Sequence, residues 1–324
     1  MAERLMVVVG YESAELLDIA GVTTSLAMAN GLGEPAVPYR VSVVGPGGGP
    51  IVCGSGLSLQ SQHSLERLVG PIDTLIVSGG VGVQRAADDR RLVGHVRRLA
   101  KESRRVASVC TGAGVLAAAG LLDGRRATTH WQFAPRLAAR HPEIEVDAAP
   151  IYIRDGNVYT SAGITSAMDL TLAFIEEDHG PELAREVARH LVVYLQRPGT
   201  QAQMSLFTAA PPPRDDLVRA LVEHIAAHPD QDLGPAALAA RAGVTPRHLS
   251  RLFTEHLGEP PGRYVRRART EAAAQLLAST ELPVASVAAR CGFGTAETLR
   301  QAFVGRYGIS PARFRATQTR RAPR

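Results

Sequence analysis

The segment Ala239-Ala240-Arg241-Ala242-Gly243 returns, nearly unchanged, 49 residues later as Ala288-Ala289-Arg290-Cys291-Gly292. A helix, a glycine turn and a second helix account for each copy, which is the helix-turn-helix pattern. Two such units in tandem predict a protein that lays two recognition helices into DNA. The same spaced residues follow both copies: Leu249, Phe253, Gly258, Pro261, Arg263 and Tyr264 in the first, and Leu299, Phe303, Gly308, Pro311, Arg313 and Phe314 in the second.

The positive charge of the chain is concentrated where this repeat lies. The 324 residues carry a formal net charge of +5. From Arg214 onward there are 17 arginines and 10 acidic residues, a net charge of +7, so the preceding part carries −2. A basic domain is expected where a protein meets nucleic-acid phosphates. The length and the 45% content of hydrophobic residues suit a globular protein with two cores.

The cysteines and the apolar stretches exclude several classes of protein. Cys53, Cys110 and Cys291 share no metal-like spacing, so we predict no metal, no cofactor and no disulfide framework. The start, Met1-Ala2-Glu3-Arg4, lacks the features of a secretory signal. The most apolar stretch, 107–122, is shorter than the roughly 20 residues of a membrane-spanning helix. We therefore expect a cytoplasmic protein without a membrane partner.

Residues 1–195 alternate short apolar runs with helical patterns, which predicts a doubly wound α/β sheet. Residues 196–214 form a polar, Pro-rich stretch that we interpret as a linker. Residues 215–324 are expected to be all helical and to carry the tandem units. The expected strands are 5–9, 39–44, 74–78 and 105–109, with a hairpin over 151–160, and the expected helices of the first domain are 15–30, 88–102, 165–178 and 181–194.

The sequence Ser108-Val109-Cys110-Thr111-Gly112-Ala113-Gly114 resembles a nucleophile elbow with cysteine in the place of serine. A strand that ends at Cys110 would expose the sulfur at a helix N-terminus, where the dipole lowers the thiol pKa. Gly79-Gly80 could then supply backbone N–H groups as an oxyanion hole. The alternative is a buried structural cysteine. The candidate pocket residues are Cys110, Asp18, Gly79, Gly80, Thr111 and His130.

Several motifs together resemble the PfpI-type branch of the class I glutamine-amidotransferase-like superfamily. They are Leu16-Leu17-Asp18-Ile19-Ala20-Gly21, Val77-Ser78-Gly79-Gly80, the Cys110 elbow, Ala127-Thr128-Thr129-His130-Trp131 and Thr160-Ser161-Ala162-Gly163-Ile164-Thr165. The resemblance covers residues 6–194 and implies a flavodoxin-like sandwich that commonly dimerises. It also implies a pocket in which Asp18 approaches Cys110.

Two of these residues allow alternative interpretations. Asp18 is either a pocket acid or the N-cap of its helix. His130 is expected on a strand, facing either the pocket or solvent. No acid follows it at a convincing spacing, so a complete Cys–His–acid triad is not expected. We interpret His130 as a ligand-facing or structural residue rather than a general base.

The segment 217–314 resembles the DNA-binding domain of the AraC/XylS family, most specifically at Cys291-Gly292-Phe293 and Gly308-Ile309-Ser310-Pro311. Thr245 is the expected N-cap of the first recognition helix. Arg247 and Arg251 are expected to donate to guanine, Glu297 to accept from cytosine, and Arg266, Arg267 and Arg313 to bind phosphates. The DNA-binding residues expected from the resemblance and from the outward helix faces are Arg247, Ser250, Arg251, Thr295, Ala296, Glu297, Thr298, Arg300 and Gln301.

The two resemblances combined match the GlxA-like group of amidase-domain transcriptional regulators. They imply a DNA-binding activator or repressor controlled by a small metabolite, such as an amino acid or a methylated amine. The expected partners are operator DNA, a second copy of the chain and, as a further candidate, RNA polymerase. The rival hypothesis is an enzyme, a Cys-dependent hydrolase, amidase or hydratase with a DNA-binding domain attached, and the pair Cys110 and Asp18 favours it.

Overall fold

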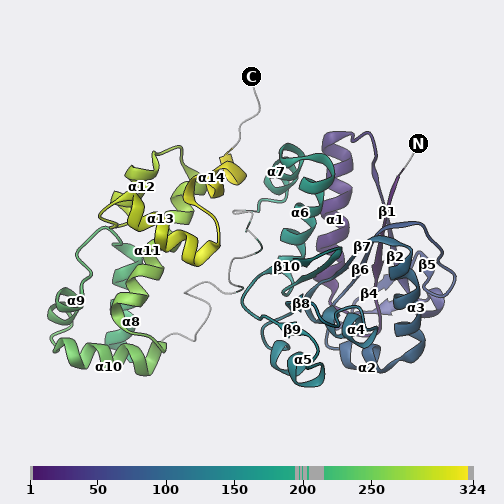
Figure 1. Ribbon diagram of the computed structural model, residues 1–324, viewed down its shortest axis with the longest axis horizontal. Coiled ribbons are helices and arrows are strands. Elements are labelled where there is room, and N and C mark those ends of the chain that lie inside the picture. Colours follow the sequence, from purple (N-terminus) through teal and green to yellow (C-terminus); the bar gives the residue numbers. More distant parts are fainter. Residues whose placement is uncertain (1–2, 194–196, 198, 200–202, 204–214, 320–324) are drawn as a thin grey trace. The chain divides into compact units, whose positions relative to one another are not determined.

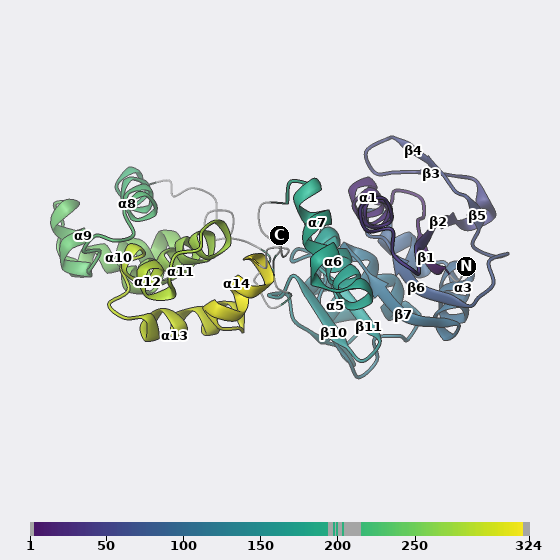
Figure 2. The ribbon, with the colours of Figure 1, turned by 90° about the horizontal axis from the view of Figure 1, so that it is seen from above.

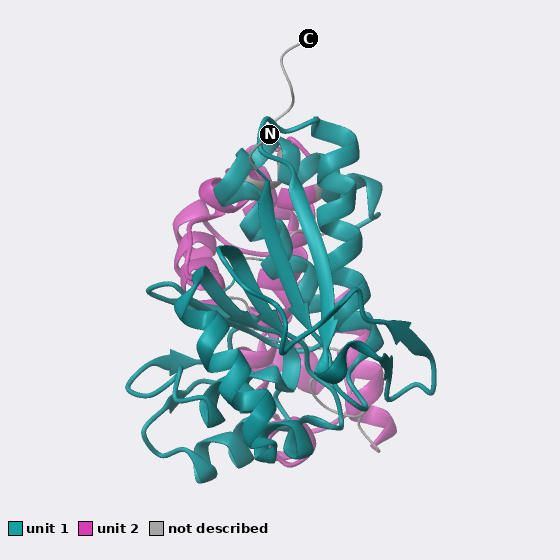
Figure 3. Cartoon of the chain, turned by 90° about the vertical axis from the view of Figure 1, so that its right-hand side faces the viewer, with its two compact units in different colours: residues 1–203 teal, residues 204–324 magenta. Residues whose placement is uncertain are grey.

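The computed structural model describes residues 3–193, 197, 199, 203 and 215–319. The chain forms two compact units, Met1–Gln203 and Met204–Arg324, which Figure 3 distinguishes by colour. The linker predicted over 196–214 lies outside the described residues except for Arg197, Gly199 and Gln203. Within the described part of the chain, no helix combines the length and apolar character needed to cross a bilayer.

The first unit is built on a seven-stranded sheet, as the alternating pattern predicted (Figure 1). All neighbouring strands are parallel except β10, which pairs antiparallel with β11 in the predicted hairpin. Met6–Val9 of the central strand are completely buried, which explains their unbroken apolar run. The strands follow in the order β10 (Tyr152–Asp155), β11 (Val158–Ser161), β7 (Ser103–Ser108), β6 (Ile72–Val77), β1 (Arg4–Val9), β2 (Tyr39–Gly45) and β5 (His63–Ser64).

Helices cover both faces of this sheet (Figure 1). The chain moves from β1 to β2 in one direction and from β6 to β7 in the other, so right-handed crossovers place their helices on opposite faces. One group contains α1 (Leu16–Gly33), α6 (Thr165–His179) and α7 (Pro181–His190), and the other α2 (Val83–Asp88), α3 (Arg90–Lys101) and α4 (Ala113–Ala118). This is the predicted flavodoxin-like sandwich.

Some boundaries and short elements differ from the predictions. The helix expected over 88–102 begins at Arg90, because the carboxylate of Asp89 accepts hydrogen bonds from the N–H groups of Arg91 and Leu92 as an N-cap. The helix expected over 181–194 ends at His190. The unpredicted elements are the edge strand β5, the helices α2 and α5 (Ala134–Arg140), and the strand pairs β3 (Pro50–Val52) with β4 (Ser58–Gln60) and β8 (Arg126–Ala127) with β9 (Glu145–Val146).

The second unit consists of the predicted tandem helices (Figure 2). Thr245 caps α10 by accepting a hydrogen bond from His248 N–H, as expected, and Gly258 ends that helix in a left-handed conformation. Phe253 and Phe303 are fully buried at equivalent positions of the two copies. The helices are α8 (Asp216–Ala227), α9 (Pro235–Arg241), α10 (Pro246–Leu257), α11 (Pro261–Ser279), α12 (Val284–Arg290), α13 (Ala296–Tyr307) and α14 (Pro311–Thr319).

Candidate functional site

Cys110 occupies a sharp turn at the carboxyl end of β7. Its φ of 53° lies in the left-handed region that non-glycine residues rarely adopt. The chain continues through a single 3₁₀ turn, Cys110–Gly112, into α4. A Cβ on Gly112 would lie 2.4 Å from the carbonyl oxygen of Val77, so the turn requires a glycine there. The backbone thus has the form of the predicted elbow.

Asp18 approaches this elbow from the first turn of α1. The N-cap of α1 is Glu15, whose carboxylate accepts a hydrogen bond from Leu17 N–H, so the cap interpretation of Asp18 is wrong. The side chain of Asp18 is fully buried, and its Oδ2 accepts a 2.9 Å hydrogen bond from Gly79 N–H. Its Oδ1 is buried without a hydrogen-bond partner in the described structure. A buried carboxylate oxygen in this state favours a protonated acid or a ligand that donates to it.

The backbone N–H groups of Gly79 and Gly80 are both occupied, so the predicted oxyanion hole is not formed. Gly79 N–H donates to Asp18, and Gly80 N–H donates to the Thr111 hydroxyl oxygen at 2.9 Å. A Cβ on Gly79 would lie 2.5 Å from Cys110 Cβ and 2.7 Å from Asp18 Oδ2. Gly79 therefore lies between the acid and the cysteine, and because it has no side chain, both can approach it closely.

The thiol of Cys110 is held in its neutral form. Its pKa is raised to about 12, chiefly by burial and to a smaller extent by the neighbouring Asp18 carboxylate. The prediction of a lowered pKa was wrong because Cys110 is only 6% exposed and α4 has only six residues. A short helix contributes little dipole, and desolvation of a thiolate then prevails. Burial also raises the pKa of Asp18, from 3.8 to about 7.

His130 lies beside Cys110, in the loop after β8 and not on the expected strand. A Cβ on Gly163 would lie 2.5 Å from His130 Cδ2 and 3.3 Å from Cys110 Sγ, so both side chains border this glycine. Burial lowers the pKa of His130, which keeps the imidazole neutral. Among the described residues no carboxylate is hydrogen-bonded to it. A complete triad is not formed there.

The described part of the predicted linker is bound beside this site, which the sequence gave no reason to expect. The side-chain amide of Gln203 donates to the carbonyl oxygen of Thr129 at 2.7 Å and accepts from Trp131 N–H at 3.0 Å. Arg197 forms a 2.6 Å ion pair with the buried Asp169 and donates to the Thr165 hydroxyl. Two positions of this segment therefore contact the loops at 129–131 and 163–165, which border Cys110.

Four exposed apolar side chains are next in sequence to residues of the Cys110 site. Leu17, Val81, Trp131 and Ile164 are 56%, 85%, 43% and 38% exposed, respectively. Each directly follows or precedes a residue of the site in the sequence, namely Asp18, Gly80, His130 and Gly163. We call these four residues the apolar rim. Large apolar side chains that remain exposed are candidates for contact with another surface.

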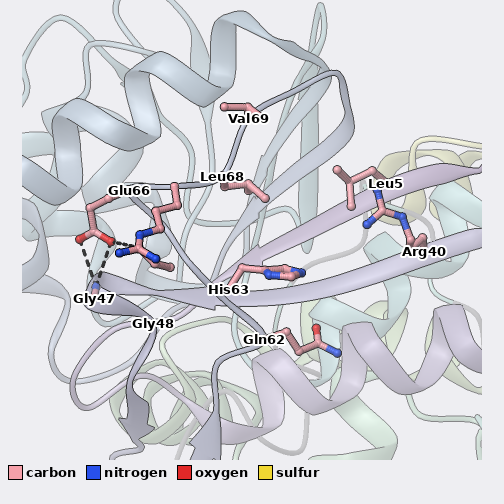
Figure 4. Close-up of a pocket in the computed structure, with 11 residues that line it drawn as sticks. Leu5, Arg40, Gly47, Gly48, Gln62, His63, Glu66, Leu68 and Val69 are labelled. Carbon is pink, nitrogen blue, oxygen red and sulfur yellow. Dashed lines mark hydrogen bonds between the residues drawn. The ribbon is translucent and has the colours of Figure 1, made fainter.

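A separate open hollow of about 770 Å³ lies at the sheet edge near β2 and β5 (Figure 4). Glu66 lines it beside Gly47, whose N–H is shared by both Glu66 carboxylate oxygens, while Arg40 and His63 form part of its wall. None of the predicted site residues lines this hollow. The predicted chemistry therefore belongs to the ends of β6 and β7.

The two recognition helices of the second unit, α10 and α13, expose most of the predicted DNA-binding residues. Arg247 and Arg251 are exposed on α10, and Ser250 is half-buried between them. On α13, Glu297 accepts two 2.7 Å hydrogen bonds from Arg300 and one from Gln301. A cytosine amino group would have to compete with these donors for the Glu297 carboxylate.

Thr295 and Thr298 hold the start of α13 through a capping box. The Thr298 N–H donates to the Thr295 hydroxyl oxygen, and the Thr295 N–H donates to the Thr298 hydroxyl oxygen. Both hydroxyl groups are therefore engaged within the helix cap.

A hollow of about 570 Å³ between α11 and α13 is lined by four arginines. Arg263, Arg266, Arg267 and Arg306 line it. Arg267 pairs with Glu259, and Arg306 pairs with Glu271. Within the described residues, Arg263 and Arg266 form no ion pair and are exposed. They are placed to bind phosphates.

Comparison with known proteins assigns both units. Residues 4–177 match the DJ-1/PfpI family, and residues 238–317 match the helix-turn-helix domain family. The chain is 35% identical to the HTH-type transcriptional regulator CdhR of Pseudomonas aeruginosa over 286 residues, 88% of this chain and 84% of that protein. It is 32% identical to the HTH-type transcriptional regulator GlxA of Rhizobium meliloti, covering 93% and 92% of the two chains.

The first unit also has enzyme relatives and fold neighbours. The isonitrile hydratase of Pseudomonas putida is 37% identical over 145 residues, 42% of this chain and 60% of the enzyme. The crystal structure of a ThiJ/PfpI family protein from Pseudomonas syringae has a TM-score of 0.55 and 23% identity, and covers 70% of this chain and 87% of its own. The latter comparison supports the fold alone.

Proposed function

The chain belongs to the DJ-1/PfpI family and, within it, to the HTH-type transcriptional regulators, and from this premise we propose that a small metabolite bound beside Cys110 controls its binding to operator DNA. The protein is a DNA-binding transcription regulator. The metabolite and the position of its site are the proposed part. The observation that carries this part is the buried, unpartnered Oδ1 of Asp18 next to Cys110.

The proposed effector carries a nitrogen cation or a hydrogen-bond donor. A cation near Asp18 would stabilise the ionised carboxylate, whose pKa burial otherwise raises to about 7. Trp131 offers an exposed aromatic face, stacked on His130 at a centroid distance of 5.8 Å, and such faces attract ammonium groups. An amino acid or a methylated amine has this chemistry. His130 and Cys110 would contact the remainder of the molecule.

The segment at Arg197 and Gln203 supplies the proposed route from the effector to the DNA-binding unit. Gln203 holds the backbone of Thr129, which precedes His130 directly. Arg197 holds Thr165, which is two residues from Gly163. A ligand that displaces His130 or Ile164 would change these hydrogen bonds. The segment at Arg197 and Gln203 would then be held either more tightly or more loosely by the first unit.

In the second unit, α10 and α13 are proposed to enter adjacent major-groove segments about one helical turn, ~34 Å, apart. Arg247, Arg251 and Arg300 would contact bases, while Arg263 and Arg266 would contact phosphates. The remaining proposed base-contacting residues are Ser250, Thr295, Glu297, Thr298 and Gln301. We further propose a homodimer in the cytoplasm, joined through the apolar rim, with RNA polymerase as a partner at the promoter.

A thermal-shift screen of the full chain tests the effector proposal. Amino acids, methylated amines and uncharged analogues of the same size are compared one by one. A ligand at 100 times its dissociation constant stabilises the folded protein by about 2.7 kcal/mol, which gives a measurable shift. The active compound should shift the wild type and leave Asp18→Ala unshifted. A hit that shifts both variants equally binds elsewhere and contradicts the site.

Hydration or hydrolysis of a ligand at Cys110 is the second candidate function. Asp18, with a pKa of about 7, is partly protonated at neutral pH and could donate a proton beside the thiol. Against this, the thiol is neutral and the N–H groups of Gly79 and Gly80 are occupied. Product analysis of the effector after incubation with wild type and Cys110→Ser decides. Conversion by the wild type alone, with the DNA response intact in Cys110→Ser, would establish the enzyme.

A further inference from the structure

Arg269 of α11 joins the two helix-turn-helix units. Its Nε donates a 2.8 Å hydrogen bond to the carbonyl oxygen of Pro229, and its Nη2 donates a 2.7 Å hydrogen bond to the carbonyl oxygen of Gln231. Both acceptors lie in the loop between α8 and α9, which belongs to the first helix-turn-helix unit. The guanidinium fork serves two carbonyl groups at once, which the single ammonium of a lysine cannot do in the same geometry.

The turn of the second helix-turn-helix unit packs against the same loop and against Arg269. A Cβ added to Gly292 would lie 2.2 Å from the carbonyl oxygen of Pro229 and 2.7 Å from both Cζ and Nε of Arg269. The α8–α9 loop, the Arg269 side chain and the turn of the second helix-turn-helix unit are therefore in direct contact. These three parts are far apart in the sequence but pack directly against one another.

The equivalent glycine of the first helix-turn-helix unit has no such contact. Gly243 has nearly the same φ, +66° against +70° for Gly292, but a Cβ on Gly243 would have no atom within 4 Å. The left-handed turn explains both glycines, whereas close packing applies only to Gly292. The repeat thus differs between its copies at the point where the copies meet.

We infer that Arg269 is a positioning residue that sets the spacing between the two DNA segments the protein recognises. One base pair more between these segments rotates the second by about 34° and moves it by about 3.4 Å. A junction that holds α13 rigidly relative to α10 discriminates against such displaced segments. The inference rests on the DNA-binding function and adds which contact defines the geometry of the target.

The test is a selection of binding sites from a random duplex library by the full chain. Wild type, Arg269→Met, Arg269→Lys and Gly292→Ala are compared. The wild type should select two sequence blocks at a single spacing. Arg269→Met and Gly292→Ala break the junction from its two sides, and each should select the same blocks over several spacings. Arg269→Lys retains the charge and should give an intermediate distribution.

Binding titrations on synthetic duplexes make the comparison quantitative. Inserting one base pair between the blocks should weaken DNA binding by the wild type about tenfold or more, which is within the range that one mismatched base pair costs. The same insertion should weaken binding by Arg269→Met about threefold or less. Arg266→Met is the matched control, because Arg266 lies one turn away on α11, is exposed and forms no ion pair among the described residues. It should bind all duplexes more weakly while retaining the wild-type discrimination.

Several results would overturn the inference. Arg269→Met with the single spacing of the wild type would show that α11 packing alone defines the geometry. Selection of different sequence blocks by Arg269→Met would assign Arg269 to base recognition instead. Circular dichroism monitors folding, and if Arg269→Met is unfolded, the spacing chosen by Arg269→Lys decides in its place. Failure of the wild type to select any DNA would contradict the regulator function rather than the role of Arg269.

Discussion

Gln203 is hydrogen-bonded to Thr129 through a 2.7 Å contact from its side-chain amide to the Thr129 carbonyl oxygen. The Thr129 hydroxyl donates in turn to the carbonyl oxygen of Cys110 at 2.7 Å. Two hydrogen bonds therefore connect Gln203, the last residue of the first unit, with the elbow. This connection gives the proposed effector control a route that can be tested by substitution.

Gln203→Ala should reduce the effect of the ligand on DNA binding. The substitution leaves the carbonyl group of Thr129 and the N–H of Trp131 without their protein partner, at a cost of about 1–3 kcal/mol in stability. Fluorescence anisotropy of labelled duplex, with and without the compound found by thermal shift, measures the response. Gln132→Ala, an exposed glutamine in the same loop, is the control. A full response in Gln203→Ala would exclude this route.

Asp18→Asn should stabilise the protein at alkaline pH. Because burial raises the folded-state pKa of Asp18 to about 7, the native state favours the protonated acid, and stability is lost as pH rises from about 4 through 7. Asparagine retains an acceptor for Gly79 N–H without the charge, so the gain at pH 8 is on the order of 4 kcal/mol at most. Thermal melts of both proteins from pH 4 to 8 measure it, and the gain should vanish at the acidic end. Glu12→Gln, at an exposed position nearby, should show no such trend.

Cys110 should react slowly with iodoacetamide at neutral pH, because its pKa is raised to about 12 and the thiolate is the reactive form. Asp18→Asn removes the adjacent negative charge and should increase the rate several-fold. Peptide mass spectrometry follows each cysteine separately. Cys291, fully buried in the other unit with a pKa raised to about 11, is the internal control and should be unaffected. Labelling of wild-type Cys110 at the rate of a free thiol would contradict the buried, neutral state.

The sequence predicted the second unit well, because its information is local and repeated. Thr245 and the glycines that end the helices mark boundaries by their own backbone preferences. The junction at Arg269 was not predicted. Nothing in the 229–231 loop signals that its carbonyl oxygens accept from a residue about 40 positions away.

In the first unit the sequence predicted the sheet and the cysteine elbow but not the electrostatics of the site. The pKa of Cys110 depends on how deeply the fold buries it, which no local pattern contains. The occupied N–H groups of Gly79 and Gly80 depend on the side chains of Asp18 and Thr111, which come from other elements. Gln203 lies in a stretch whose composition indicates only a linker. Long-range contacts of this kind are not predicted by motifs.

Arg251→Ala and Arg266→Ala should weaken DNA binding in different ways. Arg251→Ala should cost about 1–3 kcal/mol on the preferred operator and relax the preference at one base pair. Arg266→Ala should weaken all sequences alike and lower the slope of affinity against salt by about one. Titrations of the full chain at several salt concentrations measure both. Arg219→Ala on α8, where the arginine already pairs with Asp216, is the control. Equal losses on all sequences for Arg251→Ala would remove it from base recognition.

Val81→Glu should shift the protein from dimer to monomer. Val81 is the most exposed residue of the apolar rim, and a charge there would be desolvated in an interface. Sedimentation analysis of the full chain should give a dissociation constant raised by about tenfold or more. Val69→Glu is the control, because Val69 is also strongly exposed, at 70%, but lies at the hollow of Figure 4. It should leave association unchanged. A wild type that sediments only as a monomer would contradict the proposed dimer.

The left-handed backbone of Cys110 has an evolutionary consequence. A side chain held at a φ of 53° costs of order 1–3 kcal/mol, a penalty that glycine at the same position would largely avoid. Mutation toward glycine would thus be rewarded in stability in any lineage that had ceased to use the sulfur. The folding of the turn therefore does not account for a cysteine at this position, and a use of its side chain would.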